Sequence, residues 1–177
     1  MLFYCKLAKI HIMKKIIFSF FIVFLVHCCT VQNTTKIYNK ISQQDFLKQP
    51  FGFEESIKNF TAELQPEFKT QKLLRKNTHY PEKTDTIYRF YYKKSEIFFY
   101  KTYAGKEFLL AGKIMNKQIE LENGIQVGLP RTSFTDRFVD KLDYIGDSIQ
   151  LIGDGTKYTF IFKKDKLYRI NIDNYFD

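Results

Sequence analysis

The sequence predicts an α+β fold of two tandem helix-plus-antiparallel-meander units, with the helices packed on one face of the sheet. Aromatic residues are frequent, with 19 Phe and 12 Tyr, and such residues suit half-buried strands. Two segments, residues 86–98 and 156–168, share one hairpin pattern at an offset of 70 residues. Apolar residues at helical spacing precede each segment, so the same order of elements is expected twice.

The first 29 residues are typical of a signal peptide. Met13, which we take as the true start, precedes two lysines, and residues 16–26 form a predominantly apolar core. A core of this length suits a signal peptide, because it covers only about half of a bilayer's hydrocarbon thickness. We therefore expect residues 1–29 to direct export.

Two adjacent cysteines, Cys28 and Cys29, end this segment, and the only other cysteine is Cys5. An exported domain without later cysteines has no disulfide framework, so these thiols need another use. The stretch resembles a bacterial lipobox, which has Leu at −3, a small residue at −1 and the lipidated Cys at +1. Leu25 takes −3 if Cys28 is modified, and Cys28 takes −1 if Cys29 is modified. The resemblance implies a diacyl, palmitate-type anchor on one of the two; a signal without lipid and an uncleaved anchor are the alternatives.

The same resemblance implies a location in a bacterial cell envelope. No Asp follows either cysteine, which by the family's sorting rules implies the outer membrane, and the lack of an acidic run implies its periplasm-facing leaflet. Residues 30–40 are mostly polar and lack Pro and Gly, so they predict a tether. The first αβ unit is expected at residues 41–122 and the second at 123–177.

The elements of the first unit follow from their periodicity. Four apolar residues at i, i+4, i+7 and i+11 predict a helix over residues 53–64, with Pro66 just beyond its end. Residues 68–74 predict a strand. Residues 86–98 alternate aromatic and polar side chains around a Lys-Lys turn, which predicts a hairpin. Residues 107–128 predict another hairpin or the connection between the units.

The second unit repeats this order. Phe134, Phe138 and Leu142 predict a helix that starts near Pro130, and the Ser133-x-x-Asp136 sequence resembles a capping box. Residues 148–152 predict a strand, joined by an Asp-Gly turn to the hairpin at 156–168.

One stretch, residues 125–139, resembles the opening of a unit in small outer-membrane-assembly lipoproteins and in the related β-lactamase-inhibitor-protein fold. Ile125, Gly128, Phe134 and Phe138 occupy the matching positions. The resemblance implies a non-enzymatic envelope protein that binds a protein partner or assists envelope assembly.

The sequence offers no catalytic residues, metal site or cofactor motif. His79 is the only histidine after Cys29, and no serine lies in a nucleophile motif. Acidic pairs occur at 54–55 and at 120 and 122, but the first suits a helix start and the second a solvated strand. After residue 28 the chain has 24 bases and 19 acids, so its net charge is +5, and its arginines are scattered, which argues against nucleic acid as a partner.

The strand alternation predicts a surface for the partner. If the aromatic residues of the two hairpins form the core, then Arg89, Tyr91, Lys157 and Thr159 lie on the opposite, exposed face. We expect this face to bind an envelope protein, while the lipid anchor binds the membrane. The alternatives are a carrier of an apolar ligand and a small carboxylate-based envelope enzyme.

Overall fold

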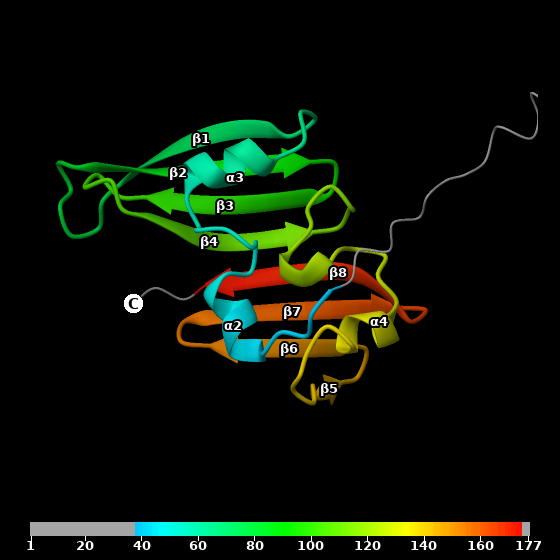
Figure 1. The fold of residues 1–177 in the computed structure, drawn as a ribbon. Coiled ribbons are helices and arrows are strands. Elements are labelled where there is room, and N and C mark those ends of the chain that lie inside the picture. The colour runs from blue at the N-terminus through cyan, green and yellow to red at the C-terminus, as the bar shows by residue number, and fades with distance from the viewer. Residues whose placement is uncertain (1–37, 175–177) are drawn as a thin grey trace, which may run out of the picture. The chain divides into compact units, whose positions relative to one another are not determined.

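An eight-stranded antiparallel sheet is the main structural element of residues 38–174, the part of the chain that the computed structural model describes (Figure 1). Its strand order is β1-β2-β3-β4-β8-β7-β6-β5. The strands are β1 (Lys69–Lys76), β2 (Thr84–Tyr92), β3 (Ser95–Lys101), β4 (Glu107–Ile114), β5 (Tyr144–Ile145), β6 (Ser148–Gly153), β7 (Thr156–Lys163) and β8 (Lys166–Asn174). Two meanders therefore meet in the middle of one sheet.

The two meanders join through β4 and β8. Residues 111–114 of β4 pair with residues 170–173 of β8, and Ile114 lies opposite Ile170. This pairing makes the sheet continuous from β1 to β5, and Figure 1 shows β8 next to β4 near its centre.

The prediction of two tandem helix-plus-meander units is wrong, because the fold is dominated by this single sheet. Only three short α-helices occur in the described residues, and they contain 6, 7 and 5 residues. They are α2 (Gln43–Lys48), α3 (Ile57–Glu63) and α4 (Arg131–Thr135). One 3-10 turn, η1 (Glu122–Gly124), lies in the connection after β4, where a second hairpin was one of the two predicted possibilities.

Both predicted hairpins are confirmed. The first turns at Lys93–Lys94 between β2 and β3, and the second turns at Lys164–Asp165 between β7 and β8. Lys93, Lys164 and Asp165 have φ values of 52°, 51° and 54°, which is the left-handed conformation that tight hairpin turns require. The strand at 148–152 is also confirmed as β6, and the strand at 68–74 as β1.

Aromatic side chains on one face of the sheet form the core under the helices. Phe60 of α3 packs against Phe90 of β2 and Phe99 of β3, with ring centroids 5.2 and 5.0 Å away. In the other half, Phe46 of α2 packs against Tyr158 of β7 at 5.5 Å. All five side chains are at most 2% exposed, so the apolar surface they bury stabilises the contact between helices and sheet.

The N-terminus of α3 is held from two sides. Ser56 is its N-cap, and the Ser56 hydroxyl accepts a hydrogen bond from the Asn59 N–H at 3.1 Å. The Glu107 carboxylate of β4 accepts the Ile57 N–H at 2.8 Å. The helix therefore begins later than the predicted residue 53, and Glu54 and Glu55 precede it instead of forming its first turn.

The predicted helix of the second unit shrinks to α4. Ser133 lies inside α4 and Asp136 is its C-cap, so the predicted capping box is wrong. The chain leaves the helix because Ile41 pairs with the backbone beside Phe138: the Ile41 N–H donates to Arg137 O at 2.9 Å, and the Val139 N–H donates to Ile41 O at 3.0 Å.

The first described residue is tied to the same region. The Arg137 guanidinium lies 3.7 Å from the centroid of the Tyr38 ring. The Tyr38 ring also covers Gly124, where a Cβ atom would overlap it. Gly124 has φ = +71°, so this position favours glycine for both its conformation and its close contact.

Candidate functional site

The sheet face opposite the aromatic core, called the open face here, carries the four residues that the sequence predicted as a partner surface. On β2 the fully buried Phe90 alternates with Arg89 and Tyr91, and on β7 the buried Tyr158 alternates with Lys157 and Thr159. The strand registers place all four on one face, because directly opposed pairs connect Arg89 to Lys157 and Tyr91 to Thr159 across the sheet.

Two cross-strand rows organise the open face. The first row contains, from β1 to β6, Lys69, Tyr91, Glu96, Lys113, Asn171, Thr159 and Gln150. The second row contains, in the same order of strands, Gln71, Arg89, Phe98, Ala111, Asp173, Lys157 and Ile152. The predicted residues thus fall in two adjacent rows, two in each.

The two halves of the predicted surface are not in contact. Strands β3, β4 and β8 lie between β2 and β7, which separates Arg89 from Lys157 by about 19 Å at the usual strand spacing. Sequence reasoning missed the residues that fill this gap, above all Glu96, Lys113 and Asn171. Their alternation with buried neighbours follows from each strand alone. The place of Glu96 and Lys113 in the row depends on the β3–β4 pairing, and that of Asn171 depends on the β4–β8 pairing.

An ion-pair network occupies the first half of the rows. The Glu96 carboxylate accepts hydrogen bonds from Lys113 Nζ at 2.8 Å and from Arg89 Nη2 at 2.9 Å. Arg89 Nη1 also donates to Gln71 Oε1 of β1 at 3.5 Å. The side chains of Arg89, Glu96 and Lys113 are 36%, 23% and 41% exposed, so the network is half in water.

Aromatic rings hold the Arg89 guanidinium from its other side. Its central carbon lies 4.7 Å from the ring centroid of Tyr91 and 5.9 Å from that of Phe98. Such cation–π contacts fix the orientation of the guanidinium plane. The Arg89 guanidinium therefore has hydrogen-bond and ring partners within the domain itself.

The Glu96 carboxylate is kept ionised by its neighbours. The Lys113 hydrogen bond is the largest cause that lowers its pKa, and Arg89 lowers the pKa further, against the opposing effect of partial burial. The network consequently carries a net positive charge at neutral pH, with one carboxylate between two cations.

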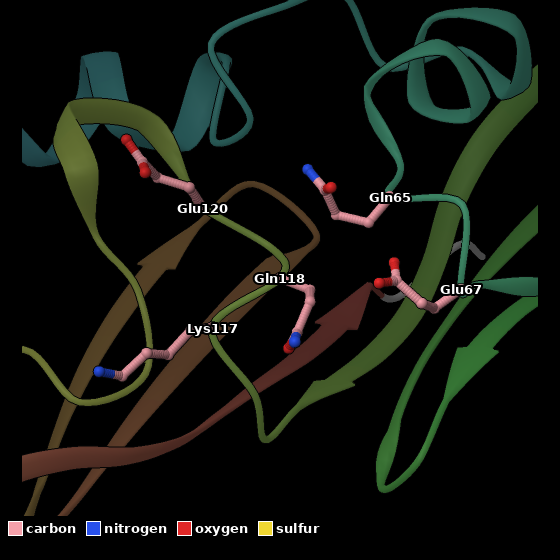
Figure 2. Close-up of a pocket in the computed structure, with 5 residues that line it drawn as sticks. All are labelled: Gln65, Glu67, Lys117, Gln118 and Glu120. Carbon is pink, nitrogen blue, oxygen red and sulfur yellow. The ribbon is translucent and has the colours of Figure 1, made fainter.

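A separate pocket of about 350 Å³ lies between the loop after α3 and the segment after β4. Its lining side chains are polar and are drawn in Figure 2: Gln65, Glu67, Lys117, Gln118 and Glu120. Gln65 and Glu67 point across the opening towards the segment with Gln118, whereas the Lys117 side chain points away from them.

Hydrogen bonds to the β2–β3 hairpin position the far wall of this pocket. The Gln118 N–H donates to Asn116 Oδ1 at 3.2 Å, and Asn116 Nδ2 donates to Tyr92 O at 3.2 Å. Glu120 lies in the irregular part of this segment and Glu122 begins η1, so the prediction that both lie on a strand is wrong. The lining offers donors and acceptors for a small polar molecule.

A third feature is the half-buried Glu55, which precedes α3 and whose pKa is raised by burial to about 7. The Tyr158 hydroxyl is fully buried and has no hydrogen-bond partner within residues 38–174. Burial raises the pKa of Tyr158 well above its ordinary value, and the Glu55 charge adds to this. Glu55 does not line the pocket in Figure 2, so the two carboxylate features are separate.

Residues 38–174 contain no cluster of side chains suited to a metal ion. No group of three or more His, Cys, Asp or Glu side chains there could hold a metal ion. His79 lies in the β1–β2 connection, where its N–H donates to Asn77 Oδ1 at 2.9 Å.

The predicted signal segment, with Cys28 and Cys29, lies outside the described residues, as does most of the predicted tether. No helix between residues 38 and 174 is long and apolar enough to cross a membrane. Comparisons of the chain with protein-family models, with curated proteins and with solved structures find no match.

Proposed function

We propose that this protein is a non-enzymatic binding protein of a bacterial cell envelope, and that it holds a protein partner on its open face. The observation that carries the proposal is the pair of cross-strand rows with the Arg89–Glu96–Lys113 network at their first half. A broad, polar and partly aromatic strand surface suits contact with another protein surface.

The chemistry of the network supports this choice. Arg and Tyr are enriched at the hot spots of protein interfaces, because each combines apolar area with hydrogen-bonding capacity. Arg89 is already held by Glu96 and by the Tyr91 ring, so little side-chain entropy is lost when a partner docks. The second half of the rows, where Lys157 and Thr159 are half-buried, adds area for the same partner.

The anchor belongs to the same proposal. Cys28 or Cys29 carries the lipid, residues 30–40 act as the tether, and the domain faces the periplasm from the outer membrane. A diacyl anchor holds a domain at a membrane far better than one acyl chain, because each buried methylene adds about 0.8 kcal/mol. The mass of the N-terminal peptide of natively extracted protein tests this part, since it identifies the modified cysteine.

Site-specific photo-crosslinking in the native envelope tests the open face. A photoreactive amino acid at Tyr91 and another at Thr159 should link to the same partner, whereas one at Lys58 on α3 should not. The Arg89→Ala variant should weaken the Tyr91 crosslink at least fivefold, and Lys58→Ala should leave it unchanged. Equal crosslink yields at Tyr91 and Lys58 would overturn the proposal. A Tyr91 crosslink yield that does not change in the Arg89→Ala variant would also overturn it.

A further inference from the structure

Strand β1 is an uncovered edge of the sheet. All eight of its residues are exposed, and Leu73 and Leu74 are 40% and 76% exposed. The β1–β2 register has no shift, and the strand contains no proline or glycine. Natural edge strands are usually short, bulged or covered, so a long regular edge is a site where another strand can pair.

The register identifies the backbone groups that are free along this edge. Lys93–Lys94 is a two-residue turn, so Tyr92 and Ser95 form a hydrogen-bonded pair, and every second residue of β2 bonds to β3. The intervening β2 residues therefore form their backbone hydrogen bonds with β1. The hydrogen bond from the Asn77 N–H to Lys83 O, at 3.0 Å, follows the same pattern beyond the end of β1. The N–H and C=O groups that point away from the sheet are therefore those of Thr70, Lys72, Leu74 and Lys76.

The edge is also basic. Its residues include Lys69, Lys72, Arg75 and Lys76, and no acid. Arg75 lies opposite Asp85, but Lys69, Lys72 and Lys76 form no ion pair within residues 38–174. A second copy of β1 in antiparallel pairing would bring two such strands of positive charge together, which disfavours self-association through this edge.

We propose that β1 adds a strand from an extended acidic segment of a partner protein. The partner's backbone pairs with the free groups of Thr70, Lys72, Leu74 and Lys76, and its carboxylates lie beside the unpaired lysines. An added strand also lengthens both open-face rows, because they begin at Lys69 and Gln71. The inference rests on the proposed function, and it states the chemistry of the partner.

A peptide of four Glu-Val repeats, labelled with fluorescein, is the probe for this edge. It should bind the full chain, purified in detergent, and the matching Lys-Val peptide should bind at least tenfold more weakly. A Glu-Val peptide that is N-methylated at alternate residues should also bind at least tenfold more weakly, because it cannot complete a ladder.

The variant Leu74→Pro removes one outward N–H without removing a β1–β2 hydrogen bond, and the Leu74 side chain is mostly exposed. It should weaken binding of the Glu-Val peptide at least tenfold. Leu74→Thr keeps the N–H and suits a strand, so it should stay within twofold of the wild type. Amide exchange gives a second readout: the N–H groups of Thr70, Lys72, Leu74 and Lys76 should become protected when the peptide binds.

Equal binding by Leu74→Pro and Leu74→Thr would overturn the inference, as would unprotected amides in the complex. Vesicles of phosphatidylglycerol in phosphatidylcholine supply the other anionic surface. If wild type and Leu74→Pro bind these vesicles equally while the peptide does not bind, the basic strand faces a membrane and the inference is wrong. The Tyr91 crosslink and its dependence on Arg89 report on the proposed function independently of this edge.

Discussion

The Glu96 carboxylate and the Lys113 ammonium lie 2.8 Å apart on adjacent strands, at the centre of the open face. The second Glu96 oxygen accepts two hydrogen bonds from Arg89, at 2.9 and 3.2 Å. One carboxylate therefore connects β2, β3 and β4 on the surface that we propose for binding.

Glu96→Gln should lower the free energy of unfolding by only about 1 kcal/mol, because all three side chains are partly in water. The pKa of Glu96 is lowered, so its stabilising contribution is present above the unfolded pKa and is lost as pH falls through the folded pKa. Urea unfolding at pH 7, in low salt and in 1 M salt, measures the effect. Lys106→Gln, on an exposed turn, is the control, and a loss above about 2 kcal/mol would contradict the half-exposed geometry.

Glu55→Gln should stabilise the fold at high pH only. Burial raises the pKa of Glu55 from 4.5 to about 7, so the folded state favours the protonated carboxyl. The stabilisation that this protonation gives is fully present below pH 4.5, and it is lost as the pH rises to about 7. The difference from wild type should reach up to about 3 kcal/mol at pH 8 and vanish at pH 4. Unfolding curves across this range test it, with Glu54→Gln as the neighbouring control. A gain that does not depend on pH would show that ionisation is not its cause.

Phe134→Ala should be among the most damaging core substitutions. Phe134 is fully buried, and its ring lies 4.7 Å from Phe160 and 5.3 Å from Phe138, between centroids. Truncation should cost about 3–5 kcal/mol, because the cavity cannot collapse onto a rigid sheet. Val139→Ala, at a side chain that is 61% exposed, should cost at most about 0.5 kcal/mol. Thermal and urea unfolding compare the two, and similar losses would mean that α4 is not fixed to the core.

Gly124→Ala should destabilise the fold more than Gly105→Ala does. Both glycines have positive φ, +71° and +85°, so alanine is strained at both. Only at Gly124 does a Cβ atom meet the Tyr38 ring; at Gly105 there is nothing within 4 Å. The difference should be at least about 1 kcal/mol, and limited proteolysis should cut the Gly124→Ala variant faster near Tyr38. Equal effects would show that the Tyr38 contact contributes nothing to stability.

The local parts of the fold were predictable from the sequence. Period-two alternation and a two-residue turn specify a hairpin almost by themselves, which is why both hairpins and β6 were predicted. The helix predicted from Phe134, Phe138 and Leu142 is present only as the short α4, because the Phe134–Phe138 spacing fits a helix and also fits the observed turn. The choice between them depends on Ile41, which pairs with the backbone at 137–139 from nearly a hundred positions away.

The site was predictable only as a face. Alternation assigned Arg89, Tyr91, Lys157 and Thr159 to one side of the sheet, because that follows from each strand alone. Glu96 and Lys113 entered the site only once β3 and β4 were paired in register, and Asn171 only once β4 met β8. Single-sequence reasoning supplies no such long-range register.

Strand β8 follows the other seven strands in the sequence, yet it lies between β4 and β7. During synthesis, β1 to β4 can pair as soon as they emerge, and β6 and β7 form their own hairpin. Strand β8 then pairs with β7 across the Lys164–Asp165 turn, and until it also pairs with β4, the edges of β4 and β8 are both unprotected. The slow step of folding is thus the joining of β4 to β8, between residues 56 to 62 positions apart, which closes two halves that are otherwise built from local hairpins.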